Sequence, residues 1–295
     1  MVTAPEKLLR RLEWKLGRRL DGRLQGAYRT VWHGAGIDFT DLRAYLPEDD
    51  VRHIDWNVTA RVDEPYVRLY TEDRELTAWL VIDRSASMRF GRDAGKESVA
   101  AELAVGIGRL VSQGGNRVGA ILFDNDAQQV IPPRTGRDQI LRITRELLRP
   151  GVAKKQGKTT DLSNMLHLAA ATTARRRSLV FVMSDFIGEP GWERPLGMLT
   201  HRHEVVVIRV VDPAELDLPD LGVILVEDAE TGEQLLVDTS DPLLRGRLAT
   251  QVDAREEAVA GGMRRAGVDA HRITTDQDLL AALVGLVQHS GRSRR

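Results

Sequence analysis

The sequence predicts an α/β protein with a doubly wound, mostly parallel sheet. Two observations predict this fold class. From residue 76 onward, apolar runs of strand length alternate with longer segments of helical periodicity. Several of these runs are almost continuous Val, Ile and Leu, which is typical of strands that are buried on both faces by helices.

Each strand is predicted from a short apolar run bounded by turn or charged residues. The predicted strands are 77–83, 117–124, 127–133, 178–185, 204–212 and 269–275. The segments between them carry apolar residues at helical spacing. The predicted helices are 95–113, 137–148, 161–175, 192–200, 242–266 and 276–289. A turn at Thr231-Gly232 between two apolar stretches predicts a β-hairpin near residues 223–238, added after the fifth strand.

The segment before the sheet has two parts, so we divide the chain into 1–75, 76–290 and a basic tail, 291–295. Residues 6–25 form a basic amphipathic helix with leucines at helical spacing. It is either a docking arm for an acidic partner or a membrane surface, or a helix packed on its own domain. Residues 33–75 are polar but contain bulky anchors such as Trp56, which predicts an ordered appendage packed on the main domain.

Composition narrows the class of protein. The formal net charge is -1, which argues against a general nucleic-acid binder. The sequence contains no cysteine, which excludes disulfides and thiolate metal sites and fits a reducing compartment. No apolar run approaches the roughly 20 residues of a membrane helix. We therefore expect a cytoplasmic protein without an integral membrane segment.

Several predicted strands end in Asp, at Asp83, Asp124, Asp185 and Asp212. Ligands of open α/β sheets bind outside the carboxyl ends of the strands, so these side chains are candidates for a site. Each one alone is better explained as the N-cap of the following helix. The seven histidines offer one close pair, His201 and His203, which we expect in a surface turn between a helix and a strand.

Asp83 differs from the other three because it begins the pattern D-x-S-x-S with Ser85 and Ser87. Carboxylate and hydroxyl oxygens are ligands of Mg²⁺ or Mn²⁺ rather than zinc. Further oxygens are expected from "GKTTDL", at Thr159 or Thr160, and from Asp185. The sequence thus predicts a divalent-metal site at one edge of the sheet.

These residues resemble the metal-ion-dependent adhesion site of von Willebrand factor type A domains. Carried over residue by residue, the resemblance implies the metal ligands Asp83, Ser85, Ser87, Thr160 and Asp185. Thr160 is preferred to Thr159 because "TDL" is similar to the family's turn into its helix. In the resembling domains, a carboxylate from another protein completes the coordination of the metal.

A second resemblance covers the segment before the sheet. "GIDFTDLRAYLPEDDVRHIDW", followed by "VRLYTEDRELT" and the D-x-S-x-S strand, is similar to the DUF58 family. The chain departs from that pattern at Asp38, where Glu is usual, and at Glu48, where Gly is usual. The resemblance implies a non-enzymatic adaptor that works with a MoxR-type AAA+ ATPase in chaperone-like maturation of a client protein.

Other functions remain as alternatives. "GVAKKQGKT" nearly matches a phosphate-binding loop, but it has one residue too many and follows a helix. A Mg²⁺-dependent phosphoryl-transfer enzyme or hydrolase could use Asp83 as its nucleophile, yet Ser85 stands where a second acid is usual. The third alternative is a structural domain with a degenerate metal site, whose polar groups satisfy one another.

Overall fold

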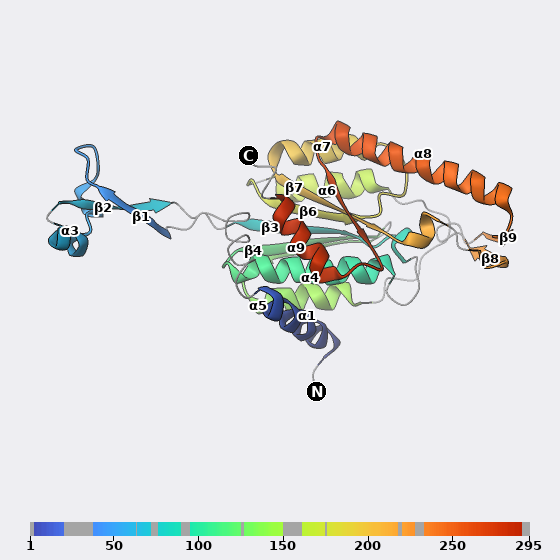
Figure 1. The fold of residues 1–295 in the computed structure, drawn as a ribbon, viewed down its shortest axis with the longest axis horizontal. Helices are drawn as coiled ribbons and strands as arrows, with labels where there is room; N and C mark the ends of the chain where they lie inside the picture. The colour runs from blue at the N-terminus through green and yellow to red at the C-terminus, as the bar shows by residue number, and fades with distance from the viewer. Residues whose placement is uncertain are drawn as a thin grey trace.

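The computed structural model describes residues 3–20, 38–62, 64–71, 76–89, 95–124, 127–149, 161–174, 176–217, 220–227 and 233–290. Its largest unit is a six-stranded sheet with the strand order β10-β7-β6-β3-β4-β5 (Figure 1). The strands are β3 Thr77–Asp83, β4 Arg117–Asp124, β5 Ala127–Arg134, β6 Leu179–Ser184, β7 Glu204–Val211 and β10 Ala270–Thr274. All neighbours pair in parallel except β5, which is antiparallel to β4 at the edge.

Helices cover both faces of this sheet, so the predicted fold class is confirmed. One face is covered by α1 Ala4–Leu20, α4 Lys96–Gln113, α5 Arg137–Leu147 and α9 Leu279–Ser290. The other face is covered by α6 Leu162–Thr173, α7 Glu193–Arg202 and α8 Pro242–Ala266. The chain turns from one half of the sheet to the other between β3 and β6, which is where a doubly wound sheet binds ligands.

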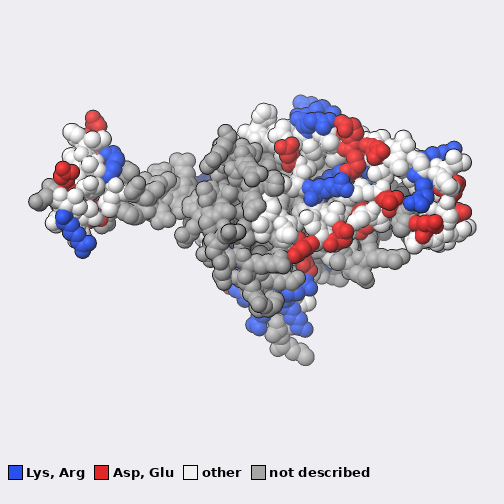
Figure 2. All heavy atoms as spheres, in the orientation of Figure 1, with Lys and Arg blue, Asp and Glu red and all other residues white. Residues whose placement is uncertain are grey.

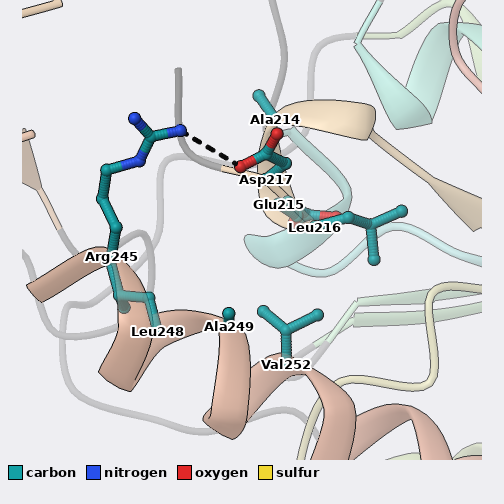
Figure 3. A pocket seen from close by; sticks show the side chains of 8 residues that line it. All are labelled: Ala214, Glu215, Leu216, Asp217, Arg245, Leu248, Ala249 and Val252. Carbon is teal, nitrogen blue, oxygen red and sulfur yellow. Dashed lines mark ion pairs between the residues drawn. The ribbon is translucent and has the colours of Figure 1, made fainter. Parts of the chain in front are cut away.

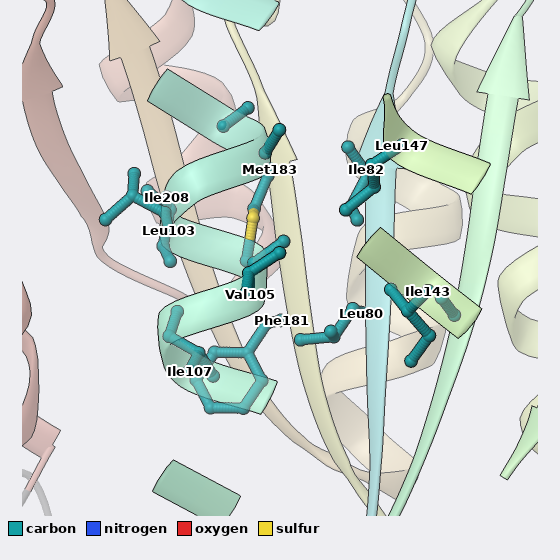
Figure 4. Close-up of a cluster of buried hydrophobic side chains, with 14 of the residues drawn as sticks. Leu80, Ile82, Leu103, Val105, Ile107, Ile143, Leu147, Phe181, Met183 and Ile208 are labelled. Carbon is teal, nitrogen blue, oxygen red and sulfur yellow. The ribbon is translucent and has the colours of Figure 1, made fainter. Parts of the chain in front are cut away.

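Alternate residues of the central strands fill two separate cores, as the two-residue period of a strand requires. In β3, Leu80 and Ile82 pack toward α4, while Trp79 and Val81 pack toward α6. Figure 4 shows Leu80 beside Phe181 of the neighbouring strand, and Ile82 further along β3 near the level of Met183. Because β3 is buried on both faces, the polar residues at its end are held at the rim of a rigid sheet.

The basic N-terminal helix α1 belongs to the first of these cores. Leu9 and Leu12 are fully buried in the cluster that also contains the apolar face of α4. An ion pair between Arg11 and Glu102 joins the polar sides of α1 and α4. Of the two interpretations of this helix, packing on its own domain is the one that the structure bears out.

The segment that matches the second sequence pattern folds as a small unit of its own. It consists of β1 Asp38–Ala44, η1 Val51–His53, α3 Trp56–Val62 and β2 Tyr66–Thr71, with β1 and β2 antiparallel. Arg43 makes two short bonds to the Asp49 carboxylate, and Asp55 caps α3 through the amides of Asn57 and Val58. These contacts give several charged residues of the pattern a structural role.

Figure 1 shows this unit to one side of the sheet, so the expected packing on the main domain is wrong for its described residues. Among the described side chains, none from residues 38–71 belongs to either of the two core clusters. Of the described apolar side chains in this segment, Val67 is buried, whereas Leu46 and Trp56 are exposed.

The predicted hairpin is present as β8 Val223–Glu227 and β9 Gln234–Asp238, which form a separate two-stranded sheet.

The expected surface position of His203 is wrong, because its ring is buried between α6 and the start of β6. Within the part of the chain that the structure describes, no helix combines the length and apolar character needed to span a lipid bilayer.

Candidate metal and partner-binding site

The carboxylate of Asp83 lies at the carboxyl end of β3 and is completely buried. The amide of Ser85 donates a hydrogen bond of 2.8 Å to its Oδ1 atom. The hydroxyl of Ser184, at the end of the neighbouring strand β6, donates a bond of 2.7 Å to Oδ2. Both oxygens are thus oriented by short bonds, one from the turn after β3 and one from the end of β6.

Ser85 and Ser87 lie on the turn that leaves β3, and their hydroxyl oxygens are 2.9 Å apart. Ser87 begins the short 3-10 helix η2, Ser87–Arg89, and the buried side chain of Met88 anchors that turn in the core. Alternate residues of the turn therefore direct their hydroxyls to one place. This is the local geometry that the D-x-S-x-S pattern predicts.

Asp185 follows β6, the strand that pairs with β3, so its carboxylate comes to the same edge of the sheet. Its side chain is buried, and its Oδ1 atom accepts a bond of 2.9 Å from the amide of Ile187. The intervening Phe186 has a φ of 57°, which is unusual for a bulky residue. A strained backbone of this kind persists where the surroundings fix it, and it often marks a functional turn.

The two buried carboxylates affect each other electrostatically. Burial, followed by the negative charge of Asp185, raises the pKa of Asp83 to about 6. The bonds from Ser184 and Ser85 act in the opposite direction and are the smaller effect. A carboxylate with a raised pKa is one whose ionised form lacks sufficient compensation, and a nearby cation would supply it.

A lysine of the same chain forms a buried ion pair with Asp185. The ammonium of Lys96, in the first turn of α4, lies 2.7 Å from Oδ2 of Asp185 and 2.5 Å from Oε1 of Glu215. Lys96 is wholly buried, which is rare for lysine unless it is paired. Sequence analysis did not identify Lys96 or Glu215, because no local pattern links residues so far apart in the chain.

Glu215 belongs to the short helix η3, Pro213–Glu215, which follows β7. Asp212 caps η3 by accepting a bond of 2.9 Å from the amide of Ala214, and it also accepts a bond of 2.9 Å from the hydroxyl of Thr275. The N-cap interpretation of Asp212 therefore agrees with the structure. Its contribution to the site is indirect, since it positions the helix that carries Glu215.

Two arginines that sequence analysis missed hold the loops around the site. Arg84, the first variable residue of D-x-S-x-S, donates to Glu97 and to the backbone oxygen of Arg149, at 2.9 and 2.7 Å. Arg209 of β7 donates to the backbone oxygen of Asp185 and forms two bonds, of 2.7 and 2.6 Å, with Glu256 of α8. Their planar guanidinium groups allow several such bonds at once.

The structure brings together Asp83, Ser85, Ser87 and Asp185 of the predicted set. Thr159 and Thr160 lie outside the described residues, and the same is true of the side chain of Asp124. Within the described ranges, no three His, Cys, Asp or Glu side chains gather as a metal-binding group. The set has only two acids, and its other oxygens are hydroxyls. In donor type it suits a hard cation such as Mg²⁺.

Comparison with known proteins identifies the family. The chain matches the model described as "Protein of unknown function DUF58" over residues 41–258. An uncharacterized protein of Mycobacterium tuberculosis is 39% identical over 280 residues, which cover 95% of this chain and 87% of that protein. One of Mycobacterium avium is 35% identical over 162 residues, covering 55% of this chain and 94% of its own length.

Among solved structures, the conserved hypothetical protein BatB from Bacteroides thetaiotaomicron aligns with a TM-score of 0.49 and 16% identity. The alignment covers 75% of this chain and all of the BatB chain. The family match spans most of the chain, from within β1 through β2 and on from β3 to β9. The chain therefore belongs to the DUF58 family.

Proposed function

We propose that this protein is a non-enzymatic adaptor that binds partner proteins through a divalent cation, Mg²⁺ or Mn²⁺, at the carboxyl edge of β3 and β6. Asp83, Ser85, Ser87 and Asp185 would hold the cation, together with Thr160. The main support is that two acidic side chains and two hydroxyls are buried together, and that the pKa of Asp83 is raised to about 6. A divalent cation would relieve the repulsion between those two carboxylates.

When bound, the cation would offer an electrophilic position to a carboxylate of another protein. The residues of this chain would set the orientation of the ligands. The Ser184 hydroxyl and the Ser85 amide hold the two oxygens of Asp83, and the Ile187 amide holds one oxygen of Asp185. Preorganised ligands lower the cost of binding. By the family resemblance, the partner is a MoxR-type AAA+ ATPase acting with it on a client.

An adaptor accounts for the site better than an enzyme does. A nucleophilic Asp83 would require a second group to donate or accept protons, and the side chain two residues later is the hydroxyl of Ser85. The oxygen atoms of Asp83 already accept bonds from Ser85 and Ser184. The ammonium of Lys96 is committed to two carboxylates, which leaves it poorly placed as a base.

The ion pairs of Lys96 favour a second function, in which the cluster is structural and holds no metal. Its ammonium already supplies one positive charge to Asp185, and the hydroxyls of Ser85 and Ser87 bond to each other. A cluster closed in this way can be a metal-free structural element, with partner binding elsewhere on the surface. The two functions differ in whether the isolated protein takes up a divalent cation.

Calorimetric titration of the metal-free protein with Mg²⁺ and with Mn²⁺ tests this difference. We expect saturable binding that is abolished by Asp83→Ala and by the double change Ser85→Ala, Ser87→Ala. Asp253→Ala, on the exposed side of α8, is the matched control and should bind normally. A wild-type protein that takes up neither ion at millimolar concentration, alone or with the ATPase, would favour the structural cluster.

The partner and the enzyme alternative need their own measurements. Binding to the MoxR-type ATPase should require a divalent cation and should be lost with Asp83→Ala. Hydrolysis of a generic phosphoester by the purified protein with Mg²⁺ should be absent. Turnover that disappears in Asp83→Ala would overturn the adaptor proposal in favour of the phosphoryl-transfer alternative.

A further inference from the structure

The hairpin β8–β9 exposes an unusual amount of apolar surface. Leu225 and Leu236 are cross-strand partners and are 61% and 70% exposed. Val223 lies on the same face as Leu225, and Leu243, in the first turn of α8, is 75% exposed. Single exposed leucines are ordinary, but a contiguous apolar group on one element marks an interaction surface.

This exposure is not the result of a loose loop, because the base of the hairpin is tied by several bonds. The buried hydroxyl of Thr239 donates to the backbone oxygen of Gly222 and accepts from the amide of Leu221, both at 2.8 Å. The Ser240 hydroxyl donates to Asp220 at 2.9 Å. The leucines therefore stand on an ordered element.

The hairpin forms a sheet of two strands only, separate from the main sheet. A two-stranded sheet in water is marginally stable on its own. Each of its strands has an outer edge with backbone donors and acceptors, which is a template for another strand. Addition of an extended segment to such an edge is a common mode of peptide recognition.

The negative charge of the segment that contains the hairpin indicates that its partner is basic. Residues 213–244 contain nine Asp and Glu and no Lys, Arg or His, whereas the whole chain has a net charge of -1. The formal net charge of the remainder of the chain is therefore +8. In the space-filling view, acidic atoms, together with some basic ones, lie at the end of the molecule where Figure 1 places the hairpin (Figure 2). Two hairpins of this kind would repel each other, which argues against pairing with a second copy.

A small pocket adjoins the segments that flank the hairpin. It has a volume of about 120 Å³ and lies between η3 and the first turns of α8 (Figure 3). Its apolar wall is formed by Leu216, Leu248 and Val252, and the weak ion pair of Arg245 with Asp217 spans its rim. A cavity of this size suits an aliphatic side chain of a bound segment.

We propose that the β8–β9 hairpin binds an extended segment of a partner protein in which apolar and basic residues alternate. The segment adds to an edge of the hairpin as a third strand. Its apolar side chains cover Leu225 and Leu236. Its basic side chains face the exposed acids Asp220, Glu233, Asp238 and Asp241. This surface is made by residues other than the cluster at β3, so it does not depend on the proposed metal.

Selection from a random library of twelve-residue peptides displayed on phage tests the proposal, with the full chain as the target. We expect enriched peptides that carry net positive charge and alternate apolar and basic residues. A synthetic peptide of the enriched sequence should bind at least about tenfold more weakly to the double variant Leu225→Ser, Leu236→Ser. Binding should also weaken at high salt, because exposed charges are screened.

The double variant Val130→Ser, Met198→Ser removes two exposed apolar side chains elsewhere and should leave peptide affinity unchanged. The proposal is overturned if no peptide is enriched, if the enriched peptides are acidic or have helical periodicity, or if binding is insensitive to the changes at Leu225 and Leu236. Sedimentation velocity should show a monomer. A wild-type dimer that the Leu225→Ser, Leu236→Ser change dissociates would assign the hairpin to a second copy instead.

Discussion

The ammonium of Lys96 is buried between the carboxylates of Asp185 and Glu215, at 2.7 and 2.5 Å from their nearest oxygens. These residues come from α4, the end of β6 and η3, so three elements meet at one charge. A buried group of paired charges adds little to the free energy of unfolding compared with apolar side chains of similar volume. Removing one partner is costly, because the remaining charge is then buried without compensation.

Replacement of Lys96 by Met should therefore destabilise the protein strongly. The change keeps an unbranched apolar side chain and leaves two buried carboxylates without their cation. We expect the free energy of unfolding to fall by about 3–5 kcal/mol in urea denaturation without metal. If the cluster binds Mg²⁺, added Mg²⁺ should restore part of this loss, since it supplies positive charge to Asp185.

Lys7→Met, on the exposed side of α1, is the matched control and should change stability by less than about 0.5 kcal/mol. An equal loss in both variants would mean that the buried ion group contributes nothing special.

Replacement of Asp83 by Asn should stabilise the metal-free protein at neutral pH. The raised pKa of Asp83, about 6, means that the folded protein binds its proton more tightly than the unfolded chain, whose value is 3.8. The stability associated with the protonated carboxyl is complete below about pH 3.8 and is lost as the pH rises through about 6. At neutral pH the ionised wild-type side chain therefore carries a penalty that Asn removes.

Thermal melting in chelator at about pH 7.5 and about pH 4.5 measures this effect. We expect Asp83→Asn to melt above the wild type at the higher pH, with a smaller difference at the lower pH. Asp253→Asn, an exposed change on α8, should show no such pH dependence. A variant that melts below the wild type at both pH values would contradict the electrostatic account of the site.

Replacement of Arg84 by Ala should loosen the connection between the β3 turn and α5. The guanidinium donates to Glu97 and to the backbone oxygens of Glu146 and Arg149, near the end of α5. Loss of these partly buried, charge-assisted bonds should cost about 1–3 kcal/mol in urea denaturation.

Arg142→Ala, on the exposed face of α5, removes the same side chain without such bonds and should cost under about 0.5 kcal/mol. Hydrogen exchange should be faster at the end of α5 in Arg84→Ala only. Unchanged exchange there would show that Arg84 does not hold this helix end.

The fold was predictable because its signals are local. The apolar runs of β3 and β6 are long enough to indicate burial on both faces, and the segments between strands have clear helical spacing. The position of residues 38–71 relative to the sheet could not be predicted, because an apolar side chain looks the same in the sequence whether it packs on another domain or, like Trp56, stays exposed.

Part of the candidate site could also be predicted, because its sequence signals are local. Asp83, Ser85 and Ser87 lie within five residues, and Asp185 directly follows β6, the strand that pairs with β3 in parallel. Lys96 and Glu215 could not be predicted, because a lysine at the start of a helix is normally exposed and no sequence pattern reveals its burial. Tertiary packing alone decides which charges meet.

The buried ring of His203 should make stability dependent on pH below neutrality. Its Nδ1 atom accepts from the Ser178 amide at 3.2 Å, and its Nε2 atom lies 3.1 Å from the Thr173 hydroxyl, which donates to Ala169. This network fits a neutral ring with its proton on Nε2. Burial, followed by the charges of Arg202 and Arg177, lowers the pKa of His203 below 6.5.

For a lowered pKa, the stability associated with the neutral ring is present above pH 6.5 and is lost as the pH falls through the folded-state value. His203→Asn keeps an acceptor for the Ser178 amide but cannot become charged in this range. Its cost in urea denaturation should therefore be larger at about pH 7.5 than at about pH 5. The exposed control His201→Asn should cost little at either pH. An equal cost for His203→Asn at both values would mean that the ring has the same pKa in the folded and unfolded states, which would contradict the lowering by burial.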